Sequence, residues 1–220
     1  ATDKSAARIR PDGSQRRGSR IQILIVFCHP ARQSFQGSIL AELIERLRRL
    51  GHAVRVLDLY AEAFDPVLDE DAWRAHRQGR SHPASDLAEH IAALKAAEGL
   101  VLVYPTWWYG LPARLKGWFD RVWQPDVAFT IEHGAFRTRQ LSRLRRFAVI
   151  TTCGSPRLFI KWGVGDPARR QLMRGLALQF ALNLKTCWAP IYAVDTRSEA
   201  DLARARAQSV RRVERLFERT

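Results

Sequence analysis

Short apolar runs alternate along this chain with longer stretches in which apolar residues recur every three or four positions. The runs Ile21 to Phe27 and Leu100 to Tyr104 are nearly continuous and rich in β-branched residues, as is typical of strands buried on both faces of a parallel sheet. Strands are predicted at 21–27, 53–59, 100–104, 147–152 and 184–194, and helical spacing occurs at 39–50, 84–97, 111–123, 166–180 and 202–217. These βα units predict an α/β chain with a doubly wound, five-stranded parallel sheet of order 2-1-3-4-5 in three layers.

The beginning of the chain differs from the rest. Residues 1–20 are polar and basic and contain too few apolar residues to form a core. We therefore predict a flexible basic arm over 1–20 and a single domain over 21–220. Within the domain, residues 60–83 are predicted to be irregular. Their acidic residues favour helix capping over a metal site, because a hard-cation loop needs an alternating pattern of oxygen ligands with a turn glycine. Those residues are Asp65, Asp69, Glu70 and Asp71.

The formal net charge of +14 predicts attraction to anions without choosing among nucleic acid, a membrane surface and phosphorylated ligands. Because basic residues occur along the whole chain, a solvated Arg-rich surface is favoured over a nucleic-acid site. Cys28, Cys153 and Cys187 have no metal-ligand spacing and fit a reducing compartment such as the cytoplasm. No apolar run approaches the ~20 residues that span a bilayer, so no membrane span is expected. The short apolar segment after the Arg16–Arg17 pair is interpreted as a first strand and not as part of an export signal.

Distinctive loops follow three of the predicted strands. After the first, a polar loop from His29 leads to Ser34, a residue type that often caps a helix, so free N–H groups are predicted to face an anion. After the third, Pro105 opens a turn with consecutive aromatic residues, which a ligand or partner explains better than a core does. After the fourth, Thr151 to Gly154 offers hydroxyl and N–H groups, with Cys153 interpreted as a small residue and not as a redox thiol. Because the carboxyl ends of parallel strands meet at one edge, the three loops predict one ligand site.

Four segments resemble the NAD(P)H:quinone oxidoreductase family with a flavodoxin-like fold. The longest and most specific is YPTWWYGLPARLKGWFDRV at 104–122. The others, in order, are FCHPARQSF at 27–35, DLYAEAFDPVL at 58–68 and VITTCGSP at 149–156. The resemblance covers 21–156 well and the remainder loosely. It implies a flavodoxin-like flavin-binding domain that passes electrons from NAD(P)H to a quinone-like acceptor. The flavin would be FAD or FMN, and the first loop resembles the FAD-binding members more.

The resemblance also implies the site residues. The flavin phosphate end would lie on His29, Gln33, Ser34, Phe35, Gln36 and Ser38. The isoalloxazine would lie between two groups, Pro105, Thr106, Trp107, Trp108 and Tyr109 on one side and Thr151, Thr152, Cys153 and Gly154 on the other. Phe159 and Trp162 would line the acceptor pocket. A homodimer is expected, with aromatic contacts near the flavin from Trp118, Trp123, Phe129 and Trp162, and 124–146 is expected to cover the flavin edge or a neighbouring subunit.

The chain departs from the family at the proton relay. Mammalian-type members use a Tyr and a His shortly after the fourth-strand loop, and those positions fall near Phe159 and Gly165 here. Neither residue can transfer a proton, so no general acid is predicted. Two other functions stay open. One is a flavin-binding ancillary subunit of the potassium-efflux type without significant turnover. The other is a nucleic-acid protein that uses the basic arm, which the spread of basic residues along the whole chain disfavours.

Overall fold

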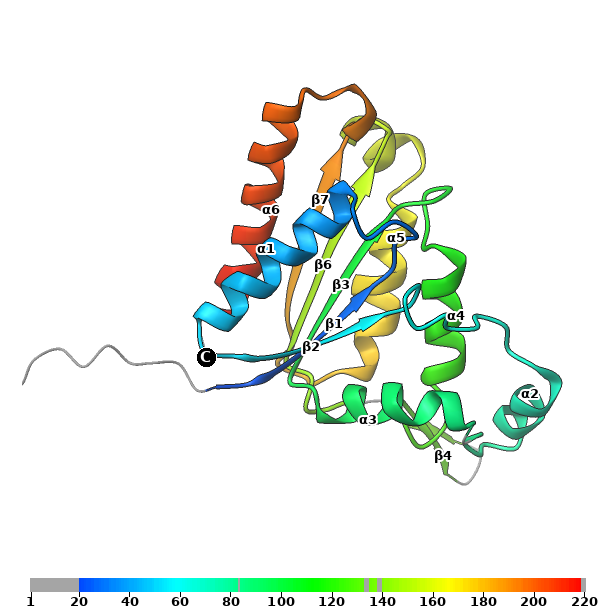
Figure 1. Cartoon of the computed structure of the whole chain (residues 1–220). Helices are drawn as coiled ribbons and strands as arrows, with labels where there is room; N and C mark the ends of the chain where they lie inside the picture. Colours follow the sequence, from blue (N-terminus) through cyan, green and yellow to red (C-terminus); the bar gives the residue numbers. More distant parts are fainter. Residues whose placement is uncertain (1–19, 83, 133–134, 138–139, 219–220) are drawn as a thin grey trace, which may run out of the picture.

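A five-stranded parallel sheet forms the centre of the chain in the computed structural model, which describes residues 20–82, 84–132, 135–137 and 140–218 (Figure 1). The predicted arm at 1–20 lies outside these residues apart from Arg20. Every neighbouring pair of strands in the sheet is parallel. The predicted order 2-1-3-4-5 is therefore confirmed. From one edge to the other, the strands are β2 (Ala53–Asp58), β1 (Gln22–Phe27), β3 (Gly99–Pro105), β6 (Arg146–Cys153) and β7 (Lys185–Tyr192).

Helices cover both faces of the sheet. The strands project apolar side chains from both faces, and the helices bury them. On one face, α1 (Phe35–Arg49) and α6 (Glu199–Glu218) pack over side chains such as Ile25 and Ile150. On the other face, α3 (Ala88–Ala96), α4 (Ala113–Val122) and the segment 159–179 pack over side chains such as Leu102 and Val149. The predicted three layers are thus present. In the part of the chain that the structure describes, no helix is both long and apolar enough to cross a membrane.

The sequence predicted that 60–83 would be irregular. In the structure this stretch contains a helix, α2 (Glu70–Arg77). No residue of α2 is buried, so the sequence contains no apolar stripe that would predict this helix. Local capping holds the helix instead: the Asp69 side chain accepts a hydrogen bond from Ala72 N at 2.7 Å, and Glu70 pairs with Arg74. Asp69 therefore caps this helix, as the capping interpretation expected.

The predicted helix over 166–180 is broken into short pieces. They are α5 (Pro167–Arg170), a π-helical stretch (Gln171–Gly175) and a 3₁₀ turn (Leu176–Gln179), preceded by another π-helical stretch (Phe159–Gly163). Changes of turn width shift which side chains face the sheet, and they are frequent near functional sites. Before α3 lies a further 3₁₀ turn (Ser85–Leu87), and Val194–Thr196 forms another before α6.

The excursion at 124–146 lies at the opposite end of the sheet from the predicted flavin edge. It contains the antiparallel hairpin of β4 (Thr130–Glu132) and β5 (Ala135–Arg137). Helix α4 carries the chain back across the sheet, and Arg145 N then donates to Glu98 O, next to the start of β3, at 3.0 Å. Within one chain, the expectation that this excursion covers the flavin edge is therefore wrong.

A buried polar pair links α3 and α4 inside the core. Trp118 is fully buried, and its Nε1 donates to His90 Nδ1 at 3.2 Å. His90 Nε2 lies 3.3 Å from Glu62 Oε2. Burial lowers the pKa of His90, so the neutral ring that accepts from Trp118 is favoured.

Candidate active site at the carboxyl edge of the sheet

The ends of β1, β3 and β6 lie side by side and bring the three predicted loops together. Cys28 N, just after β1, donates to Val103 O at 3.0 Å, and Thr106 N, just after β3, donates to Thr152 O at 2.8 Å. Parallel pairing thus continues to the points where the strands become loops. The structure confirms that the three loops share one sheet edge, which is where open α/β sheets bind ligands.

The first loop folds tightly over the start of α1. Ser34 has extended backbone angles, and its Oγ accepts a hydrogen bond from Gly37 N at 3.2 Å, as an N-cap does. His29 Nδ1 lies 3.2 Å from Ser34 Oγ and so fixes that hydroxyl from the other side. A Cβ at Gly37 would lie 1.8 Å from Arg32 O, so only glycine lets the loop approach this closely.

Gln36, in the first turn of α1, is the least satisfied polar residue of this loop. Its side chain is buried, and neither Nε2 nor Oε1 has a hydrogen-bond partner among the described residues. A buried amide without partners costs about 1–3 kcal/mol. The N–H groups at a helix start also lack partners within the helix, and the helix dipole favours an anion there. Gln36 and this helix start therefore fit a polar, anionic ligand group.

A cation that the sequence did not single out reaches the same loop from α6. Arg206 Nη1 donates to Ser38 Oγ at 3.1 Å, and Arg206 Nε pairs with Glu42 Oε2 at 2.9 Å. Ser38 Oγ in turn donates to Phe35 O at 2.7 Å. No spacing rule could have revealed Arg206, because 168 positions separate it from Ser38. Gln33, in contrast, is exposed on the loop surface.

The aromatic turn after β3 has a strained backbone. Trp107 N donates to Gly110 O at 3.2 Å and Gly110 N donates to Trp107 O at 2.9 Å, which closes a two-residue turn. The two residues between them, Trp108 and Tyr109, have φ angles of 46° and 64°. Such turns usually carry Asn or Gly, and left-handed angles at other residues cost on the order of 1–3 kcal/mol each. The Trp108 side chain is 90% exposed, so core packing does not explain it.

The loop after β6 is tied to the aromatic turn by hydroxyl groups. Thr106 Oγ1 and Thr151 Oγ1 are 2.9 Å apart and form a hydrogen bond. Thr152 and Cys153 are buried. A Cβ at Gly154 would lie 2.1 Å from Asp195 Oδ2, so the Asp195 carboxylate lies directly against this glycine.

A second polar cluster lies on the face of the sheet under these loops. Tyr104, at the end of β3, is fully buried, and no hydrogen-bond partner of its Oη is found in the described part of the chain. It pairs in register with Thr151 on β6, as Cys153 pairs with Tyr192 on β7. Burial raises the pKa of Tyr104 and of Tyr192, and the Asp166 carboxyl contributes to both shifts. None of these three residues was predicted from the sequence to belong to the site.

Exposed apolar side chains border the site. Phe159 contacts Tyr109 with ring centroids 5.9 Å apart, and Trp162 is exposed. The expectation that Trp118, Trp123 and Phe129 would also offer surface contacts near the flavin is wrong. Their side chains are in the core, because the apolar stripe of α4 and the residues after it faces the sheet.

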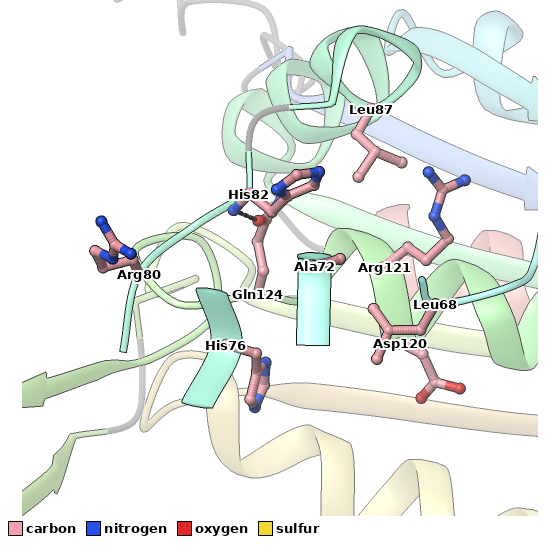
Figure 2. A pocket seen from close by; sticks show the side chains of 9 residues that line it. All are labelled: Leu68, Ala72, His76, Arg80, His82, Leu87, Asp120, Arg121 and Gln124. Atoms are coloured by element: carbon pink, nitrogen blue, oxygen red, sulfur yellow. Dashed lines mark hydrogen bonds between the residues drawn. The ribbon is translucent and has the colours of Figure 1, made fainter. Parts of the chain in front are cut away.

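Two cavities lie beside α4, away from this edge. Figure 2 shows one between α2 and α4, where His82 N donates to Gln124 Oε1. Its volume of about 10 Å³ suits no more than one water molecule. A groove of about 490 Å³ runs nearby along α4 and includes Trp73 and Phe129. Neither contains a residue of the three loops.

The chain matches known proteins over most of its length. A family profile described as having a flavodoxin-like fold matches residues 22–216. The chain is 31% identical over 163 residues to the ribosyldihydronicotinamide dehydrogenase (quinone) of Pongo abelii, with 67% of this chain and 70% of that protein covered.

Two solved structures are similar in fold. An NAD(P)H:quinone oxidoreductase from Methanothermobacter marburgensis has a TM-score of 0.75 and 24% identity, and the match covers 91% of this chain and 96% of that one. An FMN-dependent NADH-azoreductase from Bacillus anthracis, in complex with FMN, has a TM-score of 0.68 and 18% identity, and the match covers 89% of this chain and 99% of that one. At these identities the two structures support a shared fold.

Proposed function

The chain belongs to the family with a flavodoxin-like fold, and from this premise we propose that it passes two electrons from NAD(P)H through a bound flavin to a quinone-like acceptor. The observation that carries the proposal is the meeting of three loops at one sheet edge. They are a helix start with a buried unpaired amide, a strained aromatic turn and a Thr-rich loop. The names of the curated relative and of a structural neighbour describe quinone-linked oxidoreductases, which supports the same chemistry.

The residues present fit the phosphate end of a flavin. Gln36 offers both a donor and an acceptor, and the start of α1 offers N–H groups with a favourable dipole. Arg206, fixed beside Ser38, adds a positive charge at the same loop. His29 and Ser34 hold each other and would orient the loop around the phosphate.

The ring of the flavin would lie between the aromatic turn and the Thr151–Gly154 loop. When bound, a flavin supplies the hydride and electron transfer itself. The protein would orient the ring with Trp107, Trp108 and Tyr109, and the N–H groups of the loop would stabilise negative charge that develops on it. Phe159 and Trp162 would exclude water from the acceptor and pack against it.

The proposal concerns the flavin mononucleotide part, which FMN and FAD share. The first loop resembles the FAD-binding members more, but the comparisons do not support a preference for FAD, because two structural neighbours whose descriptions name a flavin contain FMN. We expect titration of the flavin-free protein with each cofactor to decide between them.

A homodimer is part of the same proposal. Large exposed apolar patches mark binding surfaces, and Trp107, Trp108, Phe159 and Trp162 form exposed apolar surface along this edge. A second copy would cover that surface and complete the acceptor pocket. Three free cysteines suit a reducing compartment, so we propose a cytoplasmic location.

The test is NAD(P)H oxidation by the flavin-loaded protein with 1,4-benzoquinone as acceptor. Turnover that requires both flavin and benzoquinone supports the proposal. Tight flavin binding with no oxidation of NADH or NADPH would overturn it in favour of an ancillary flavin-binding subunit. Sedimentation at micromolar concentration tests the dimer, and a monomer would contradict it.

A further inference from the structure

We propose that a hollow at the amino end of β7 binds a small anion that carries two or more phosphate groups. The hollow has a volume of about 360 Å³ and is lined by residues of β7 and α6. These residues are Lys185, Thr186, Cys187, Arg212, Arg215 and Leu216. The proposed flavin site is at the carboxyl ends of the strands, so this hollow is a separate site and the inference does not rest on the proposed function.

The charged side chains of the hollow are all hydrogen-bond donors. Lys185 contributes an ammonium group, Arg212 and Arg215 contribute guanidinium groups, and neither kind of group can accept a hydrogen bond. Among the described residues, no Asp or Glu lines the hollow. The Leu216 carbonyl oxygen, which could act as an acceptor, already accepts from Arg146 Nε at 3.1 Å. The group that complements this lining is therefore an anion with several acceptor oxygens.

The three cations are not neutralised within the described part of the chain. No ion pair or side-chain hydrogen bond joins Lys185, Arg212 or Arg215 to another described residue. Elsewhere on α6 the pattern differs, because Arg206 Nε lies 2.9 Å from Glu42 Oε2. Positive charges that share one hollow repel one another, and an anion bound among them would offset that repulsion.

The walls of the hollow are fixed by the backbone. Lys185 is the first residue of β7, and its N donates to Arg145 O at 2.9 Å. It pairs in register with Arg146, the first residue of β6. The contact of Arg146 Nε with Leu216 O then ties the start of β6 to α6. The strand and the helix that present the cations are thus held in place before a ligand arrives, which lowers the cost of binding.

The dipole of α6 explains only part of this charge. The helix ends at Glu218, and Arg215 is the basic residue of its last turn, where a cation is favourable. Arg212 precedes that turn, and Lys185 is on a strand. Because the dipole acts over the last turn only, these two cations need another explanation.

The chemistry and size of the hollow indicate the class of ligand. Arginine presents a planar fork of donors that matches phosphate oxygens, and lysine adds a compact positive charge. A volume of about 360 Å³ is at the low end of the range for small-molecule sites. In the described ranges, its lining has no aromatic side chain on which a nucleic-acid base could stack. A compact oligophosphate group fits these features better than a nucleic acid does.

Cys187 provides a local reporter of binding. It lines the hollow and is half-buried, whereas Cys28 and Cys153 are buried. Burial raises the pKa of the Cys187 thiol, and the nearby Arg212 counteracts that effect. The rate at which the dianionic disulfide dithiobis(2-nitrobenzoate) modifies Cys187 therefore depends on the positive charge of the hollow, and only the phase that disappears in Cys187→Ser is analysed.

The experiment measures this rate against the concentration of sodium tripolyphosphate, with the ionic strength held constant by sodium chloride. The variants are Arg212→Gln and Lys185→Gln, and Arg211→Gln is the matched control. Arg211 is an exposed arginine on the same helix that does not line the hollow, so the control removes the same charge from beside the site. All three side chains are exposed, so none of the substitutions disturbs the core.

We expect saturating tripolyphosphate to slow the modification of Cys187 at least about fivefold. Arg212→Gln and Lys185→Gln should each raise the half-maximal concentration about tenfold, because each removes a hydrogen bond between charged groups. Arg211→Gln should change it by less than about twofold. ATP and phosphatidylcholine vesicles that contain phosphatidylinositol bisphosphate then distinguish the sources. Protection by ATP assigns a soluble phosphate compound, protection by the vesicles assigns a lipid headgroup, and both support the shared chemistry.

Three results would overturn the inference. The first is a rate that tripolyphosphate lowers no further than sodium chloride does at the same ionic strength, which would mean charge screening alone. The second is an equal loss of protection in Arg211→Gln and Arg212→Gln. The third is duplex DNA that protects Cys187 at a lower phosphate concentration than tripolyphosphate, which would assign the surface to nucleic acid. None of these measurements needs a flavin, so they stand whether or not the proposed function holds.

Discussion

Gly154 offers the sharpest test of how the loop after β6 works. We predict that Gly154→Val abolishes tight flavin binding, and that Cys153→Ala leaves it within about threefold of wild type. The new Cβ would lie 2.1 Å from Asp195 Oδ2 and 3.2 Å from Asp195 Cγ. The first distance is more than about 1 Å inside normal contact. Because Ala193 N donates to Ser155 O at 3.1 Å, the two loops stay together, and the new side chain competes with the Asp195 carboxylate for the same space.

The expected magnitude follows from the hydrogen bonds that a displaced loop would lose. Each is worth roughly 1 kcal/mol, and more where charge is involved. Losing two or three of them weakens binding by about a hundredfold, because 1.4 kcal/mol corresponds to a factor of ten. Cys153→Ala keeps its backbone N–H and removes only a buried thiol, so those hydrogen bonds survive.

The assay is a fluorescence titration of each flavin-free variant with FMN and with FAD. A second pair of variants separates the possible causes. If displacement by Asp195 is the cause, Gly154→Ala should weaken binding and Gly154→Ala/Asp195→Ala should restore it. Binding of flavin by Gly154→Val within about threefold of wild type would refute the assignment of this loop. Loss of turnover in Cys153→Ala with flavin still bound would show that the thiol takes part in the chemistry.

Two further predictions follow from buried polar groups. Replacing Gln36 with Leu should raise the melting temperature of flavin-free protein, because it removes unpaired amide atoms that cost about 1–3 kcal/mol. The same variant should bind flavin at least about tenfold more weakly. A variant with the stability and flavin affinity of wild type would show that the amide has no ligand. Burial lowers the pKa of His90 and of His52, so the unfolded chain binds protons more readily than the folded one. The contribution of these two histidines to stability should therefore be constant above about pH 6.5 and decrease as the pH falls below it. Urea unfolding at several pH values should show a smaller decrease in His90→Asn than in wild type.

The fold was predictable because its signals are local and repeated. Continuous apolar strands, helical stripes and four family-like segments each pointed to the same parallel sheet. Helix α2 was not predicted, because none of its residues is buried and the helix depends on capping by Asp69. The broken helix over 166–180 escaped because π-helical turns leave an apolar spacing that resembles an ordinary helix.

The site was predictable only where neighbouring residues in the sequence form it. The three loops lie together as expected, because each follows a strand of the same sheet. Arg206 reaches the first loop from the last helix, so no spacing in the sequence indicates its contact with Ser38. The left-handed backbone of Trp108 and Tyr109 could not be predicted either, because that kind of turn normally carries Asn or Gly. The choice of flavin and the dimer remain predictions.

The most direct measurement is the visible absorbance of the purified protein, before and after incubation with FMN or FAD, followed by anaerobic addition of NADPH or NADH and then of 1,4-benzoquinone. The account predicts a flavin spectrum at about one flavin per chain, bleaching of that spectrum by a reduced nicotinamide, and its return when benzoquinone is added. A protein that acquires no flavin spectrum from either cofactor at saturating concentration would contradict it.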